Sequence, residues 1–155
     1  MKRFSCFLIL GACAFAADSA TDATDAIRAV RSVTDAGVNF RDYGTRVQEA
    51  KVKLDKFAAQ PDKDAALHAK LDTILRLYLL AGERWRIDVA RDDLGYAPLG
   101  EREMQPANTE ACPAIAQIVA TAKEEKPSGP AFAVGYRVKV PILWKCAASK
   151  LDEVH

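Results

Sequence analysis

Three observations predict an all-α protein, an up-and-down bundle of four to five helices. Apolar residues recur at three- and four-residue steps over long segments between residues 21 and 94. Prolines stand between these segments rather than inside them. The alternation typical of a strand occurs only near residues 132–140, and a single strand without a partner cannot form a sheet. A short extended segment at 132–140 is therefore the one expected exception to helix.

The first helix is expected to start within residues 21–25, where Thr and Asp oxygens can cap the free amides of a helix N-terminus. Gly37 and Asn39 are expected to end or bend it. The second helix stops at Gln60–Pro61, because the residue before a proline is pushed out of helical geometry. Its buried stripe has 3,4,3,4,3 spacing and comprises Phe40, Tyr43, Val47, Ala50, Leu54 and Phe57.

The third helix, from about residue 64 to residue 94, has the most regular pattern in the chain. Asp62 or Asp64 is expected to cap its start, and Gly95 to end it. A helix of this kind needs neighbouring helices to cover its apolar side. The predicted stripe comprises Leu67, Leu71, Ile74, Tyr78, Ala81, Trp85 and Asp88.

In the last third of the chain, the apolar residues follow less regular steps. Residues 95–108 are expected to form an exposed loop, and a fourth helix to begin at a cap provided by Asn108 or Thr109, with Pro113 in its first turn. The final helix starts at about Pro141, with Trp144 beside its apolar face. That face comprises Leu143, Cys146 or Ala147, Lys150 or Leu151, and Val154.

The N-terminus predicts an export signal. Two basic residues, Lys2 and Arg3, precede an apolar run from residue 4 to residue 17 that ends in small residues, where a peptidase can cut. The run is too short to span a bilayer, which takes about 20 apolar residues. We therefore expect a signal peptide at residues 1–16 and one mature helical domain at residues 17–155, periplasmic or secreted from a bacterium.

A second processing route remains open at the same leader. Leu10-Gly11-Ala12-Cys13 resembles the lipobox of bacterial lipoproteins, in which the cysteine is acylated and becomes the first residue. On this route residues 1–12 are the signal, and Cys13 anchors the protein to the outer membrane. The residues that follow Cys13 are less polar than a lipoprotein tether usually is, which favours ordinary cleavage before Ala17.

Composition restricts the class of partner. The chain is 50% hydrophobic and 28% charged, as is ordinary for a soluble globular protein. Its net charge of +1 becomes −1 once Lys2 and Arg3 leave with the leader. A near-neutral chain with mixed signs lacks the basic surface of nucleic-acid-binding proteins. No second long apolar run follows the leader, so no transmembrane span is expected in the mature form.

The two cysteines outside the leader, Cys112 and Cys146, are expected to form a structural disulfide. In an oxidising compartment two remaining cysteines most often pair. Closing a loop of this length should stabilise the fold by about 3–4 kcal/mol in the chain-entropy model. A redox or metal-binding thiol is the alternative, but the chain has no C-x-x-C motif to support it.

Few residues suit metal binding or catalysis, and we expect no metal, no cofactor and no enzyme activity. The histidines are His68, expected on or near the helix surface, and His155, the last residue. No Glu-x-x-His pair of the di-iron type occurs. Four acids near the end of the third helix could form a paired-carboxylate hydrolase site, but interleaved arginines favour a solvated face of salt bridges. These acids are Glu83, Asp88, Asp92 and Asp93.

The same region contains the best candidate for a binding surface. Trp and Arg dominate binding hot spots, so Trp85 would anchor a partner if it were exposed between two arginines. Its match to the core spacing instead favours burial. The candidate surface comprises Tyr43, Tyr78, Arg84, Trp85 and Arg86. For a small ligand, the corresponding prediction is a pocket between the helices near the two tyrosines and Trp85.

Several motifs resemble a loose family of small exported bacterial α-helical proteins. They are the run Gly37-Val38-Asn39-Phe40-Arg41-Asp42-Tyr43, the pair Ala50-Lys51, Tyr78-x-x-x-Gly82 with Trp85, and Leu143-Trp144-x-x-Ala147-x-x-x-Leu151. The resemblance covers about two thirds of the chain and leaves out residues 95–140. It implies a helical domain and no catalytic activity.

The sequence thus predicts an exported helical bundle without catalytic activity, an interaction or envelope-associated protein whose partner is an unidentified envelope protein or small molecule. One alternative is a bundle that binds a small molecule between its helices. A second is an inhibitor or immunity protein against an envelope-acting enzyme. The third is a hydrolase that uses the acids between residues 83 and 93.

Overall fold

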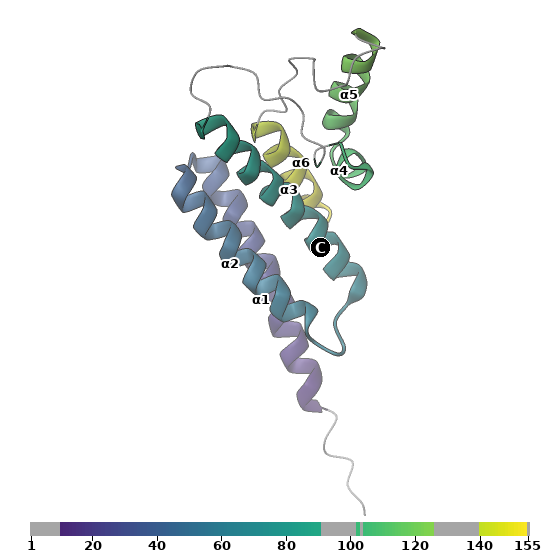
Figure 1. Ribbon diagram of the computed structural model, residues 1–155. Helices are drawn as coiled ribbons and strands as arrows, with labels where there is room; N and C mark the ends of the chain where they lie inside the picture. The colour runs from purple at the N-terminus through teal and green to yellow at the C-terminus, as the bar shows by residue number, and fades with distance from the viewer. Residues whose placement is uncertain (1–9, 91–101, 103, 126–139, 155) are drawn as a thin grey trace, which may run out of the picture.

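A computed structural model describes residues 10–90, 102, 104–125 and 140–154 (Figure 1). Within these ranges the chain forms helices and no strand, which confirms the all-α prediction. The helices are α1 (Leu10–Ala36), α2 (Phe40–Ala58), α3 (Ala65–Ala90), α4 (Pro106–Ala111), α5 (Pro113–Glu125) and α6 (Val140–Asp152). The extended segment predicted at 132–140 lies outside the described residues, except that Val140 begins α6.

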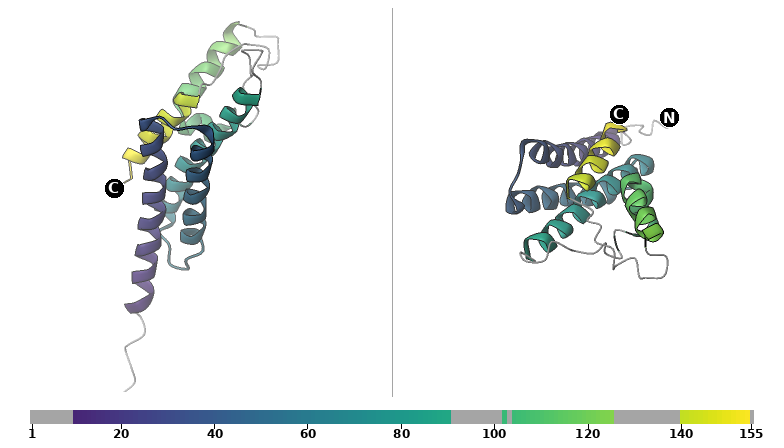
Figure 2. Two further views of the ribbon diagram at one scale, coloured as in Figure 1. Left: turned by 90° about the vertical axis from the view of Figure 1, so that its left-hand side faces the viewer. Right: turned by 90° about the horizontal axis from the view of Figure 1, so that it is seen from above.

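Four of these helices form the bundle. Figures 1 and 2 show α1, α2 and α3 running up, down and up beside one another, with α6 lying against α3. α6 also contacts α1, and the shared core is apolar. The short helices α4 and α5 lie outside this bundle, where α4 touches α3 and α5 touches α6. None of the helices described is both long enough and apolar enough to cross a membrane.

α1 begins earlier than predicted. It continues without a break from Leu10 to Ala36, so the prediction of a start within residues 21–25 was wrong. The physical reason is the alanine-rich run ahead of residue 21, because alanine is the residue most favourable to helix. Gly37 ends α1 as expected, with φ at 83°, a left-handed conformation that glycine adopts without a steric penalty.

Side-chain caps fix the starts of the next two helices. The Asn39 side-chain oxygen accepts a hydrogen bond from the Asp42 amide at 2.9 Å and so caps α2. Of the two candidates for α3, Asp64 is the cap, because its Oδ1 accepts from the amides of Ala66 and Leu67 at 2.9 and 3.0 Å. The predicted stripe of α2 is buried, apart from Phe40, which is 37% exposed.

The predicted fourth helix is in fact two helices. Asn108 and Thr109 lie inside α4 instead of capping a helix, so that prediction was wrong. Cys112 leaves helical geometry at φ −133° and ψ 88°, and Pro113 then begins α5. Proline disfavours helical geometry in the residue before it, and it cannot donate the amide hydrogen that a continuing helix would need. Pro113 therefore divides the segment at Cys112.

α6 buries the face that was predicted for it. Where the spacing left two candidates open, Ala147 and Leu151 are buried, whereas Cys146 and Lys150 are half-exposed. The core joins this face to the stripes of α1, α2 and α3, and α5 adds Ile115 to it. The largest fully buried side chains are Tyr43, Tyr78, Phe57, Ile27, Leu71, Ile74, Leu77, Ile115, Leu143 and Val30.

Candidate functional site

Cys112 and Cys146 meet as predicted. The Sγ atoms of Cys112 and Cys146 are 2.05 Å apart, at bonding distance, and their Cα atoms are 5.3 Å apart. Cys112 lies between α4 and α5 and is fully buried, and Cys146 lies on α6. The pair therefore ties the two short helices to the bundle, and it fixes where α4 sits over α3.

The predicted aromatic residues gather at one end of α2, α3 and α6. Tyr43 lies against both tryptophans, with ring centroids 5.6 Å from Trp85 and 5.5 Å from Trp144. The two tryptophans are 5.5 Å apart, edge to face, and Phe40 lies 5.5 Å from Trp85. Each such pair contributes about 0.5–1.5 kcal/mol beyond the area that it buries. These four rings fill the space between the helices.

Tyr43 also holds α2 to α3 through its hydroxyl. That hydroxyl donates a hydrogen bond to the Tyr78 carbonyl at 2.6 Å, inside the core. Burial raises the pKa of the Tyr43 phenol well above its ordinary value of 10, because the charged form would be desolvated. Burial also raises the pKa of Tyr78, whose own hydroxyl is buried without a hydrogen-bond partner among the described residues. Both phenols therefore stay neutral in the folded protein at ordinary pH.

The prediction that five residues form one binding surface was wrong for three of them. Tyr43 on α2 is 1% exposed, and Tyr78 and Arg84 on α3 are 0% and 2% exposed. α2 and α3 pack against each other, and α3 also contacts α1, α4 and α6. Trp85 is half-buried in the aromatic group, and Arg86 alone is exposed. The small-ligand pocket expected near the tyrosines and Trp85 stays a prediction.

The predicted acidic site is only partly within the described residues. Glu83 forms an ion pair with Arg102, at 2.9 Å between Oε2 and a guanidinium nitrogen, so this partner lies outside α3 and is not one of the arginines interleaved with the acids. Asp92 and Asp93 lie outside the described residues, and of Asp88 only the backbone position on α3 is described. His68 is half-buried, with its ring 6.0 Å from that of Phe57. Among the described side chains, no three His, Cys, Asp or Glu come together as metal ligands.

A groove that was not predicted runs between α3 and the residues that lead into α4. Its volume is about 500 Å³, within the range of small-ligand sites. We call it the arginine groove, and its lining comprises Arg76, Leu79, Leu80, Glu83, Arg86, Arg102, Gln105 and Asn108. Among its described lining residues, three arginines stand with a single glutamate.

Two residues that line the arginine groove, Asn108 and Arg76, each have a buried polar atom without a hydrogen-bond partner among the described residues. Asn108 is 3% exposed, and its Nδ2 donates to the Arg102 carbonyl at 2.5 Å, which leaves Oδ1 without a hydrogen-bond partner. Arg76 Nε is also buried without one, as judged within the described part of the chain. Buried polar atoms are normally paired, but both of these are closed off from solvent, so a ligand in the groove could not reach either of them without a rearrangement.

A second groove of about 420 Å³ lies on the other side of α4. Arg76 lines both grooves, which places its guanidinium between them. The second groove carries both signs of charge: Lys70 and Lys150 stand near Glu110 and Glu153. Lys150 Nζ is 3.0 Å from Glu153 Oε1, so part of this charge is already paired.

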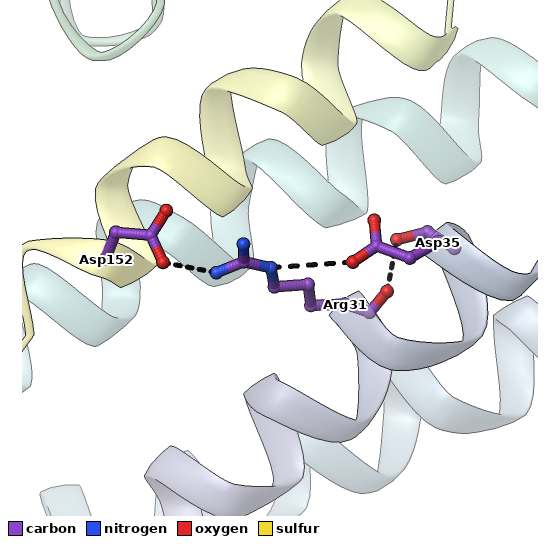
Figure 3. Close-up of polar contacts among 4 residues, drawn as sticks. Arg31, Asp35 and Asp152 are labelled. Atoms are coloured by element: carbon purple, nitrogen blue, oxygen red, sulfur yellow. Dashed lines mark hydrogen bonds and ion pairs between the residues drawn. The ribbon is translucent and has the colours of Figure 1, made fainter.

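A cluster of charged side chains joins the C-terminal end of α1 to the C-terminal end of α6. Arg31 on α1 lies between Asp35 and Asp152, the last residue of α6 (Figure 3). Its Nε is 3.6 Å from Asp35, and its terminal nitrogen bonds to Asp152. That hydrogen bond raises the pKa of the guanidinium, and the Arg31 charge in turn opposes the rise in the pKa of Tyr78. We interpret this cluster as structural, since it joins α1 to α6.

Sequence reasoning missed Arg76, Arg102 and Asn108. Arg76 stands beside the core stripe of α3 and is indistinguishable there from other surface arginines. Asn108 was interpreted as a helix cap from its residue type. The spacing of the prolines at 106 and 113 is the one signal that could have indicated a short separate helix, and hence a second wall over α3.

Comparison with known proteins does not assign the chain to a protein family. No protein-family model, no curated protein and no solved structure matches this sequence. The resemblance to small exported helical proteins therefore stays a prediction, and the function has to be inferred from the residues and the geometry described above.

Proposed function

We propose that this protein is an exported, non-catalytic helical bundle that binds a protein partner in the periplasm or at the cell envelope. The leader at residues 1–16 supports export. The Cys112–Cys146 pair supports a location where disulfides persist. Acylation of Cys13 is the alternative, and it would anchor the same domain to the outer membrane.

The open face of α3 is the observation that carries this proposal. Leu79 is 37% exposed and stands between the arginine positions 76 and 86 on that face, which lines the arginine groove. Arg86 is exposed and makes no ion pair within the described residues. Arginine is enriched in interfaces, and an uncompensated positive charge steers a partner of opposite sign. We therefore expect the partner to present acidic and apolar groups.

An inhibitor or immunity protein for an envelope-acting enzyme is one form of this function. In that case the partner is the enzyme, and the α3 face would contact acidic residues around its active site. A gene for such an enzyme next to the gene for this chain would favour this form over a purely structural role at the envelope.

Partner capture with paired variants tests the proposal. The tagged protein is expressed with its leader, crosslinked in intact cells and purified, and the captured protein is identified and then produced separately. Leu79→Asp and Arg86→Glu should each weaken binding of that purified partner by about tenfold or more, because a residue central to an interface contributes at least about 1.4 kcal/mol.

Arg41→Glu is the matched control, because Arg41 is an exposed arginine on α2 and does not line the arginine groove. It makes the same change of charge as Arg86→Glu and should leave binding unchanged. Equal weakening by Arg41→Glu would show a general charge effect and contradict the assigned face. Turnover of a substrate by the purified protein would contradict the non-catalytic function itself.

A further inference from the structure

The side of α2 that points away from the core carries a mostly apolar hollow of about 620 Å³. α2 packs against α1 and α3, and its buried stripe lies on the opposite side of the helix from this hollow. Val52 stands in the hollow and is 53% exposed. The lining comprises Gly44, Thr45, Gln48, Glu49, Val52 and Lys53.

Five residues on this side of α2 are arranged symmetrically along the helix. Arg41, Gly44, Gln48, Val52 and Asp55 follow one another at steps of three, four, four and three residues, so they share one face, which we call the outer face of α2. Gln48 is the middle residue of this series. The two residues at its ends carry opposite charges. Of the two residues next to the middle, one has no side chain and the other has an exposed apolar one.

A series of this kind fits a second copy of itself that runs in the opposite direction. In a dimer with two-fold symmetry both copies contribute the same patch, so every contact occurs twice. With Gln48 at the axis, Val52 of each copy would lie level with Gly44 of the other, where an added Cβ meets nothing within 4 Å and room is left for a side chain. Arg41 of each copy would lie level with Asp55 of the other. The two Gln48 amides could bond to each other, because an amide both donates and accepts.

The ion pairs within the chain do not oppose this arrangement. Lys51 Nζ donates to one carboxylate oxygen of Asp55 at 2.7 Å, and a carboxylate can accept from a second cation as well. The ion pairs that α2 makes within the described residues use Arg46, Lys51 and Lys53 as their cations. Arg41 is exposed and is not among them.

We propose that this protein forms a homodimer in which the outer faces of two α2 helices pack antiparallel about Gln48. This association goes beyond the proposed partner binding, because it uses α2 in place of α3 and needs no other protein. One helix from each copy buries less than the about 1,200–2,000 Å² of stable interfaces, so the dimer is weak and reversible.

Sedimentation equilibrium of the purified full chain, from about 10 μM to 1 mM, tests for this dimer. A monomer over the whole range would overturn the proposal. Val52→Asp should weaken the dimer about tenfold or more, because it places a charge in the apolar contact twice per dimer. Val89→Asp is the matched control and should leave the dimer unchanged, since Val89 is a valine on α3 that is 55% exposed. Association that Val52→Asp does not weaken would show that the copies meet elsewhere and would overturn the proposal.

An exchange of charges tests the antiparallel register. Arg41→Asp and Asp55→Arg should each weaken the dimer about tenfold, because each variant places like charges level with each other at two positions. The double variant Arg41→Asp/Asp55→Arg should restore the affinity of the natural sequence, and a double variant as weak as the single ones would overturn the register. A monomer in which Val52→Asp weakens binding of the captured partner would mean that the outer face binds that partner instead of a second copy. Failure of partner binding is measured separately, with Leu79→Asp and Arg86→Glu on α3.

Discussion

At the scale of single residues, the hydroxyl groups of the two buried tyrosines differ in their hydrogen bonding. The Tyr43 hydroxyl holds the Tyr78 carbonyl at 2.6 Å, whereas the Tyr78 hydroxyl is buried without a partner among the described residues. A hydrogen bond inside a core contributes about 1 kcal/mol, and a buried polar group without one costs free energy. The same change, loss of one hydroxyl, should therefore have opposite effects at the two positions.

We predict that Tyr43→Phe lowers the free energy of unfolding by about 1–1.5 kcal/mol, because it leaves the Tyr78 carbonyl without this donor. Tyr78→Phe should be neutral or stabilising, since it removes a hydroxyl that is desolvated and unpaired. Urea denaturation followed by circular dichroism measures both. A loss of stability in Tyr78→Phe equal to that in Tyr43→Phe would contradict the assigned hydrogen bond.

The sequence could predict which aromatic residues are buried but not what their polar atoms do. Helical spacing correctly placed Tyr43, Tyr78 and Trp85 on inward faces. The candidate surface failed because Tyr43, Tyr78 and Arg84 are all buried, and the burial of Arg84, at 2% exposed, is the one that the spacing did not predict. Spacing gives the direction of a side chain from its own helix, and it does not say how many neighbouring helices cover that direction. Burial of Arg84 depends on those neighbours.

At the scale of helices, the packing of the Tyr43 ring of α2 against α3 depends on a glycine. A Cβ atom added at Gly82 would lie 3.2 Å from Tyr43 Cε1, which is too tight unless the ring moves. The ring is held by its hydrogen bond and by its packing against Trp85 and Trp144. Gly44 on α2 is a helix-interior glycine where an added Cβ meets nothing within 4 Å.

We predict that Gly44→Ala stabilises the protein and that Gly82→Ala destabilises it. Alanine in a helix interior is favoured over glycine by about 0.5–1 kcal/mol, and Gly44→Ala should gain most of this. At Gly82, overpacking costs about 1–3 kcal/mol and should exceed that gain. The two midpoints of thermal unfolding should therefore shift in opposite directions. A matching rise in both would show that the Tyr43 ring can move.

The disulfide has its effect on α4 and α5 rather than on the bundle. We predict that the double variant Cys112→Ala/Cys146→Ala lowers the free energy of unfolding by about 3–4 kcal/mol, the chain-entropy value for a loop of 34 residues. Denaturant titration measures this loss, and hydrogen exchange should show reduced protection in α4 and α5 before α1 and α2.

Reducing agent provides the control for the disulfide prediction. It should produce the same loss in the natural sequence and no further loss in the double variant. An unchanged midpoint after reduction would mean that packing alone holds α4 and α5 against α3 and α6 and would contradict the prediction.

At the scale of the whole molecule, the long helices were predictable and the grooves were not. The apolar stripes of α2, α3 and α6 could be predicted from the sequence, because the spacing of each stripe repeats within a single helix. The arginine groove forms only where the wall around Asn108 comes to lie over α3, and this depends on the break at Cys112 and on its bond to Cys146. Such a juxtaposition of distant segments leaves no periodic signal, so Arg76 and Arg102 looked like ordinary surface residues.

Removal of the leader should leave this molecule intact. The first side chain that the structure shows to be buried on α1 is Ala23, seven residues after the predicted cleavage point. Lys53 on α2 reaches back to Asp22 at 2.5 Å, and this ion pair also lies within residues 17–155. The core therefore needs none of residues 10–16 for the contacts that are described.

We predict that the chain from Ala17 to His155 and the full chain differ in free energy of unfolding by less than about 0.5 kcal/mol. Substitutions on a protein surface usually change stability by no more than this amount. Parallel urea titrations measure this difference. Intact-mass analysis of the exported protein should show a start at Ala17. A lipid adduct on Cys13 would establish the lipoprotein route instead. A large loss of stability on truncation would mean that residues 10–16 belong to the fold, and this result would contradict the signal-peptide boundary.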